Sequence, residues 1–252
     1  MNRTFLDDGS GLLCKILEWD TSFFGFKIAQ VAKRKVTLHE ADLMISWATR
    51  DSIRCIYLLT EVDDGDTIRV AEDSGFHLMG VRMTLENNRI LLDQKLPASM
   101  DGNITIRASE AEDIPILREI AKVSHHHTHF YQDQNFQREM CDSLYETWVE
   151  NNCKGSADTV LVILIDHNPI GYVSCHLSGN ERGRIGLTAI APGFRGRTLG
   201  VRLLTESLSW FMSRGVRQVS VVAHGRNYVA QRLYQKLGFR TTAMELWYHK
   251  WL

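Results

Sequence analysis

The first ninety residues alternate short apolar runs with segments of helical periodicity. Residues 12–31 hold two apolar runs on either side of a turn-rich aromatic stretch, Trp19 to Gly25. This pattern predicts a strand, a packed loop and a second strand. Apolar side chains recur at helical spacing over residues 37–50, which predicts an amphipathic helix. The other expected elements of this half are a strand at 55–59, a helix at 67–73 that stops at Gly75, and a strand at 77–86.

A polar stretch then interrupts this alternation. Residues 92–103, LDQKLPASMDGN, contain a proline and a glycine and show neither helical nor strand periodicity. The sequence therefore predicts an N-terminal α/β domain at residues 1–93, a linker at 94–103 and a second domain at 104–252.

The second half starts a new series of elements. Three apolar runs separated by polar turns predict antiparallel strands, and strands then alternate with helices, so we expect an α/β fold with a mixed sheet. The expected strands are 104–107, 160–165, 169–177, 185–190, 218–223 and 243–248, and the expected helices are 109–123, 136–151, 201–212 and 227–236.

Residues 184–204, RIGLTAIAPGFRGRTLGVRLL, lead from a strand through a glycine-containing loop into a helix. The first N–H groups of a helix have no partner within it and lie at the positive end of its dipole, so they favour a phosphate. Gly196 and Gly200 permit a close backbone approach, and three arginines add positive charge. The stretch matches neither G-x-G-x-x-G nor a P-loop, so a plain strand-to-helix turn with solvated arginines remains an alternative.

Composition narrows the classes of protein. Hydrophobic residues make up 44% and charged residues 23%, as in a soluble globular chain, and the net charge of −1 provides no general attraction to nucleic acid or to anionic membranes. The five cysteines are dispersed, which fits a reducing compartment better than a disulfide framework. Near the N-terminus, acidic residues stand where a signal peptide would need its apolar stretch, and no apolar run is long enough to span a membrane. We therefore expect a cytoplasmic protein with no membrane or nucleic-acid partner.

Four histidines occupy five positions at residues 125–129. Side chains at neighbouring positions diverge, whereas zinc sites draw on separated ligands, so no metal is expected although His125 and His129 lie four apart. A solvated polar loop is one interpretation and a loop of a substrate cleft is another. In a cleft, the substrate-binding candidates would be His125, His129 and Tyr131.

The order of elements in the second half, the loop R-G-x-x-x-G at 195–200 and the motif LYQKLGF at 233–239 together resemble the GCN5-related N-acetyltransferase (GNAT) superfamily. The resemblance covers residues 104–252. It implies a GNAT acyltransferase fold, N-acetyltransferase activity, acetyl-CoA as co-substrate and no metal. The segment AEDSGF at 71–76 echoes the second motif, so the first domain resembles a degenerate, partial GNAT domain that serves packing and substrate recognition.

The resemblance also implies roles for single residues. Tyr234 would be the general acid that protonates the departing thiolate. A backbone N–H near Ala189 or Ile190 would polarise the thioester carbonyl. His176 and Glu181 are both candidates for the proton acceptor. The implied acetyl-CoA-binding residues are Leu187, Thr188, Ala189, Ile190, Arg195, Gly196, Arg197, Thr198, Leu199, Gly200, Val201 and Asn227.

Thr198 departs from the family pattern, because it stands where the loop has its middle glycine. Either the loop turns with less strain than usual, or the hydroxyl donates to a phosphate oxygen.

The segment LEWDTSFFGF at 17–26, ahead of a GNAT domain, resembles the TDP-fucosamine acetyltransferases. This resemblance implies a nucleotide-linked amino sugar of the dTDP-4-amino-4,6-dideoxygalactose type as the acceptor, and the family further implies a homodimer formed through the last strand. The alternatives are an acetyltransferase acting on a protein, peptide or polyamine amine, and a non-catalytic module that binds acyl-CoA.

Overall fold

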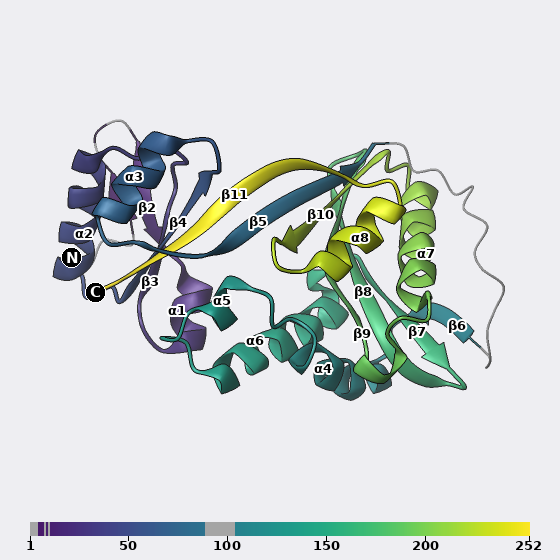
Figure 1. Ribbon diagram of the computed structural model, residues 1–252. Coiled ribbons are helices and arrows are strands. Elements are labelled where there is room, and N and C mark those ends of the chain that lie inside the picture. The colour runs from purple at the N-terminus through teal and green to yellow at the C-terminus, as the bar shows by residue number, and fades with distance from the viewer. Residues whose placement is uncertain (1–4, 8, 10, 89–103) are drawn as a thin grey trace. The chain divides into compact units, whose positions relative to one another are not determined.

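The computed structural model describes residues 5–7, 9, 11–88 and 104–252, so the predicted linker at 94–103 lies outside the described residues. The chain divides into two compact units, one with residues 1–82 and 243–252 and one with residues 83–242. This division differs from the predicted boundaries at 93 and 104. The physical reason is that two long strands, β5 (His77–Asn87) and β11 (Arg240–Trp251), each contribute residues to both units (Figure 1).

The first unit is built on a mixed sheet. Its strand order is β1-β2-β3-β4-β11, in which β3 and β4 run parallel and the other neighbouring pairs are antiparallel. Its elements, beside the parts of β5 and β11 that belong to it, are β1 (Phe5–Asp7), β2 (Leu12–Ile16), α1 (Glu18–Phe24), β3 (Ile28–Val31), α2 (Leu38–Arg50), β4 (Cys55–Glu61) and α3 (Gly65–Asp73).

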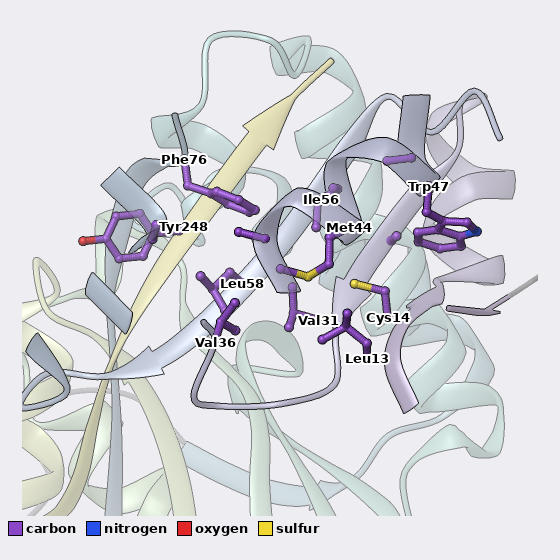
Figure 2. Packing of buried hydrophobic residues seen from close by; sticks show 14 of the residues in the cluster. Leu13, Cys14, Val31, Val36, Met44, Trp47, Ile56, Leu58, Phe76 and Tyr248 are labelled. Atoms are coloured by element: carbon purple, nitrogen blue, oxygen red, sulfur yellow. The ribbon is translucent and has the colours of Figure 1, made fainter. Parts of the chain in front are cut away.

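Helix α2 and the sheet enclose the core of this unit. The helix begins at Thr37, whose hydroxyl accepts the N–H of Glu40 while the Glu40 carboxylate accepts the N–H of Thr37, so both ends of a capping box are present. Figure 2 shows Met44 and Trp47 of α2 among strand side chains such as Ile56 and Leu58. The predicted helix over 37–50 is confirmed.

The stretch from 18 to 24 differs from the prediction of a packed loop, because it forms helix α1. Trp19 and Phe23 stack with ring centroids 5.1 Å apart, the contact expected of side chains four positions apart on a helix. Gly25 ends the helix with φ of 77°, in the left-handed region. Asp, Thr and Ser favour turns and also the first turns of helices, so residue types alone did not separate the two.

The second unit has the strand order β5-β10-β9-β8-β7-β6, with β9 and β10 parallel and the strands from β9 to β6 antiparallel. The predicted elements of the second half are confirmed with shifted ends. The elements of this unit, beside its parts of β5 and β11, are β6 (Ile104–Ala108), η1 (Ala111–Asp113), α4 (Ile114–Lys122), α5 (His129–Gln132), α6 (Arg138–Asn151), η2 (Asn152–Ser156), β7 (Thr159–Ile165), β8 (Asn168–Ser178), β9 (Arg182–Ile190), η3 (Pro192–Phe194), α7 (Leu199–Ser213), β10 (Gln218–His224) and α8 (Tyr228–Lys236). Of these, α5, η2 and η3 were not predicted.

The two faces of this sheet are covered by different helices. A Cβ added at Gly183 would meet the Phe211 ring at 2.5 Å, so this face of β9 packs against α7. Side chains alternate along a strand, so Arg182 and Arg184 lie on the other face. On that face Tyr172 of β8 binds His125, which follows α4. Among the described helices, none is both long enough and apolar enough to cross a membrane.

Candidate functional site

Strands β9 and β10 separate part of the way along their length. Their parallel pairing runs from Arg182 opposite Gln218 to Ile185 opposite Val221 and then ends. Beyond that point β9 continues to Ile190 and stays paired with β8. The side of β9 that faced β10 is therefore an open strand edge from Gly186 onward.

A β-bulge marks the point of separation. Val173 lies opposite Thr188 and Cys175 opposite Ile185, so Ser174 alone faces two residues of β9. The N–H of Leu187 donates to Ser174 Oγ at 2.8 Å, which holds the bulge in place. A bulge re-aims the strand beyond it, here just where β10 leaves.

The bonding pattern beyond the bulge shows which backbone groups are open. The N–H of Ala191 donates to the Ile170 carbonyl at 2.8 Å, and bonded pairs alternate in an antiparallel ladder. Ala189 therefore bonds to β8, whereas the N–H and C=O groups of Thr188 and Ile190 turn to the open edge. Consistent with this, the Ile190 carbonyl accepts Arg195 Nε at 2.9 Å. Four residues of this strand, 187–190, were predicted to bind acetyl-CoA. Of these, Thr188 and Ile190 present open backbone groups.

A cavity of about 370 Å³ follows this edge. It is lined by residues from the end of β9, the following loop, the start of α7, and α8. The predicted residues it brings together are Thr188, Ala189, Ile190, Arg195, Gly196, Thr198, Leu199, Gly200, Val201, Asn227 and Tyr234. Leu187 and Arg197 do not line it.

The loop end of the cavity is rich in N–H donors. Among the described residues, the backbone N–H groups of residues 196–200 have no hydrogen-bond partner, and the first in-helix bond is from Val201 to the Thr198 carbonyl at 2.9 Å. Such donors at a helix start suit a phosphate. The Arg195 guanidinium also donates to Ser124 Oγ at 3.0 Å, so this side chain connects the loop, the end of β9 and the segment after α4.

Thr198 adopts the conformation of the glycine that it replaces. Its φ is 60° and ψ 0°, in the left-handed region, which is a genuine outlier for a β-branched residue. Its hydroxyl donates to the Arg197 carbonyl at 2.6 Å. The expectation of a less strained loop is therefore wrong, because the turn into α7 requires this backbone geometry. The alternative expectation, that the hydroxyl donates to a phosphate oxygen, stays a prediction.

We expect Thr198→Gly to raise the free energy of unfolding by about 0.5–1 kcal/mol. Left-handed geometry costs a side chain of this kind about 1–2 kcal/mol, and the greater freedom of glycine in the unfolded chain removes part of that gain. Urea unfolding followed by circular dichroism measures the change. A lower unfolding free energy in the variant would show that the Arg197 contact outweighs the strain.

Tyr234 lies on α8 beneath the open strand edge. Its side chain is 5% exposed and its ring lies 5.8 Å from that of Phe239. Burial raises the pKa of Tyr234 to about 12, although the nearby Thr188 hydroxyl lowers it. The phenol therefore keeps its proton at neutral pH and is available as a proton donor beside the open strand edge.

Asn227 is bound first to its own helix. Its side chain accepts the N–H of Ala230 at 3.1 Å and so caps α8. The residue still lines the cavity, so a ligand contact through its amide N–H₂ remains a prediction. Arg197 stacks on Phe194 with its guanidinium carbon 5.7 Å from the ring centroid, on the exposed side of the loop.

The three predicted substrate residues lie among aromatic side chains outside this cavity. His125 Nε2 is 2.9 Å from the Tyr172 hydroxyl and its ring stacks on Tyr145, and burial with nearby positive charge lowers its pKa to about 3. The Tyr131 hydroxyl donates to Asp142 at 2.6 Å. His129 is buried, with its ring 4.0 Å from Phe130. Their role toward a substrate stays a prediction.

The two candidate proton acceptors also lie apart from the cavity. Glu181 forms an ion pair with Arg217 at 3.3 Å, and His176 lines a separate cavity described below. Among the described residues, no three His, Cys, Asp or Glu side chains are grouped closely enough to hold a metal ion.

Several lining residues were not among the predicted site residues. They are Ser124, His127, Phe194, Val229, Ala230 and Leu233. Ser124 and His127 belong to the histidine-rich stretch, but only the tertiary structure shows which of its side chains reach the cavity. The helical spacing of Ala230, Leu233 and Tyr234 would have placed them on one face of α8.

Comparison with known proteins follows this geometry. Residues 120–239 match the family model described as the acetyltransferase (GNAT) family. The spore coat polysaccharide biosynthesis protein SpsD of Bacillus subtilis is 25% identical over 244 residues, which is 94% of this chain and 83% of that protein. An uncharacterized N-acetyltransferase of Methanocaldococcus jannaschii is 28% identical over 92 residues, or 34% of this chain and 41% of its own.

Solved structures have the same fold. A GCN5-related N-acetyltransferase from Sphaerobacter thermophilus aligns with a TM-score of 0.65 at 16% identity, covering 96% of this chain and 77% of that one. A tandem GNAT protein from the clavulanic acid biosynthesis pathway aligns with a TM-score of 0.60 at 13% identity, covering 98% and 81%. The second likeness supports a two-part arrangement. The family match places a GNAT acetyltransferase domain in residues 120–239, so the protein is an acyltransferase, and the solved structures show the same fold.

Proposed function

We propose that this enzyme transfers the acetyl group of acetyl-CoA to the amino group of a nucleotide-linked amino sugar of the dTDP-4-amino-4,6-dideoxygalactose type. The observation that carries the transfer chemistry is the open edge of β9 beside a buried, protonated Tyr234. The relative named as a spore coat polysaccharide biosynthesis protein supports a sugar as the acceptor. The segment at 17–26 supports the same choice.

The residues of the cavity fit acetyl-CoA. The open N–H groups of 196–200 suit its pyrophosphate, and the backbone groups of Thr188 and Ile190 suit the amides of its pantetheine arm. A side chain at Gly200 would be in tight contact with α8, since an added Cβ would lie 3.1 Å from Leu233 Cδ2. Close approach of the ligand to the start of α7 depends on that missing side chain.

The transfer is a direct attack. The neutral sugar amine attacks the thioester carbonyl, which a backbone N–H at the open edge of β9 polarises. A C–N bond forms and the C–S bond breaks, and the sulfur takes the proton of the Tyr234 hydroxyl. The nitrogen releases its extra proton to water, and the Tyr234 hydroxyl regains a proton from solvent. The products are the acetylated sugar amide and coenzyme A as the free thiol.

The test is a panel of acceptors incubated with acetyl-CoA, with thiol release and mass spectrometry of the product as readouts. We expect the highest kcat/KM with a dTDP-linked 4-amino sugar, a lower value with UDP-linked amino sugars, and none above background with spermidine or a lysine peptide. Turnover confined to the peptide or polyamine would contradict the proposed acceptor. Acetyl-CoA binding without turnover of any amine would favour a non-catalytic module.

A further inference from the structure

A second cavity, of about 460 Å³, lies in the same unit. Its walls include Arg182 and Arg184 of β9, His176 of β8, and Gln218 and Ser220 of β10. The register places Arg182 opposite Gln218 and Arg184 opposite Ser220, so these side chains share one face of the sheet. It is the face away from α7, because Gly183 lies between the two arginines and a Cβ built on it would point to the Phe211 ring of α7.

The cavity meets the open strand edge at the bulge. A Cβ built on Gly186 would point to Ser174 Oγ at 2.5 Å and His176 Nε2 at 2.7 Å, and His176 lines the second cavity. Thr188, on the other side of the bulge, lines the first cavity with Tyr234. The bulge therefore lies between residues that contact the two cavities. A group there could reach the proposed acetyl position from the face opposite Tyr234.

The charged side chains of the second cavity are not paired with one another. Glu86 accepts from Gln218 Nε2 at 2.8 Å, and Asp158 accepts the N–H of Leu177 at 2.7 Å, so both acids are hydrogen-bonded to neutral donors. Within the described residues, neither Arg182 nor Arg184 lies within ion-pair distance of a carboxylate. By contrast, Arg107 is 2.6 Å from Asp113 and Arg118 is 2.7 Å from Glu150.

Partial burial makes the missing partner of Arg184 costly. Removal from water lowers the pKa of the Arg184 guanidinium, and no carboxylate offsets that cost. Burial, followed by the charge of Arg184, also lowers the pKa of His176, so this ring adds no positive charge near neutral pH. A ligand that brings its own negative charge would supply the missing partner, and a guanidinium matches phosphate oxygens in two-point geometry.

We propose that this cavity is an anion subsite for the acceptor, in which Arg184 and Arg182 bind its phosphate groups while its amine lies at the opening beyond Ile185. This inference rests on the proposed function and assigns the part of the acceptor that the cavity recognises. Arg184 lies two strand residues before Gly186, about 7 Å along β9. A sugar ring between a phosphate and an amine spans a gap of that order.

The binding test does not require turnover. Inorganic pyrophosphate and dTDP are titrated calorimetrically into the full chain held with saturating coenzyme A, so that the first cavity is filled. We expect Arg184→Gln to weaken binding at least tenfold and the double variant with Arg182→Gln to weaken it further. Arg217→Gln is the matched control, since its side chain is 79% exposed and already paired with Glu181. Equal affinity in wild type and Arg184→Gln would overturn the subsite.

Kinetics separate the subsite from the proposed function. With a dTDP-linked amino sugar, Arg184→Gln should raise the acceptor KM about 10- to 100-fold and leave the KM of acetyl-CoA unchanged. If dTDP binds through Arg184 but no nucleotide sugar is acetylated, the subsite stands and the proposed acceptor is wrong. If the sugar is acetylated with the same KM by both proteins, the proposed function stands and the subsite is wrong.

Discussion

Tyr234→Phe is expected to lower kcat about 100-fold or more while the affinity for acetyl-CoA stays within about twofold. Loss of a positioned general acid costs typically 10²–10⁴ in rate. Phenylalanine keeps the ring that packs near Phe239, so the helix and the cavity wall should persist. The measurements are steady-state kinetics with the best acceptor and calorimetric titration of acetyl-CoA.

The matched control is Tyr228→Phe, on the same helix. Tyr228 is 65% exposed and does not line the cavity, so its hydroxyl should not affect turnover. An unchanged kcat in Tyr234→Phe with normal binding would exclude this phenol as the acid.

The pH profile provides a second readout of the same residue. The protonated phenol is the active form, so activity that depends on it falls as pH rises through its pKa. Because burial raises that pKa to about 12, the loss lies above the usual assay range. From pH 6 to 9 we expect the wild-type rate to rise with pH as the acceptor amine loses its proton, with no alkaline limb from Tyr234.

Gly200→Val is expected to weaken acetyl-CoA binding about 10- to 100-fold. An added Cβ would lie 3.1 Å from Leu233 Cδ2 and 4.0 Å from Ile190 Cγ1, and all three residues line the cavity. Overpacking of this kind costs about 1–3 kcal/mol, and each 1.4 kcal/mol is about tenfold in affinity. Calorimetric titration of acetyl-CoA measures the loss.

Gly193→Ala is the control for this loop. Gly193 has no atom within 4 Å of an added Cβ and lies in the short turn before Arg195, so binding should be unchanged. Circular dichroism and thermal unfolding of Gly200→Val separate lost binding from lost folding. A folded variant that binds acetyl-CoA normally would show that ligand does not approach the start of α7.

Local patterns predicted most elements of the fold. The helical spacing over 37–50 and the capping residues Thr37 and Glu40 are local signals, and α2 forms where they place it. The prediction of a packed loop at 18–24 was wrong because its turn-forming residues also begin helices. The stacking of Trp19 on Phe23 favours the helix. The strand β11 was predicted too short, at 243–248, because its pairing with β4 extends it to Trp251.

Some features of the site could likewise be predicted from local patterns, whereas others depend on the tertiary structure. The glycine-containing loop and the tyrosine motif are short sequence patterns, and the structure brings Arg195, Gly200 and Tyr234 to one cavity. Which strand groups are open was beyond any local pattern, since that depends on where β10 leaves β9 and on the pairing of β9 with β8. The histidine stretch likewise needed the fold to show that Ser124 and His127 reach the cavity.

By itself the sequence determined the order of elements, the loop into α7 and the residue types around it, because these follow from periodicity, caps and turn chemistry within a few positions. Only the tertiary structure decided that Thr198 takes left-handed geometry, that Thr188 and Ile190 present open backbone groups, and that two arginines without carboxylate partners share a cavity. The physical reason is that strand pairing, burial and charge balance depend on residues far apart in the chain.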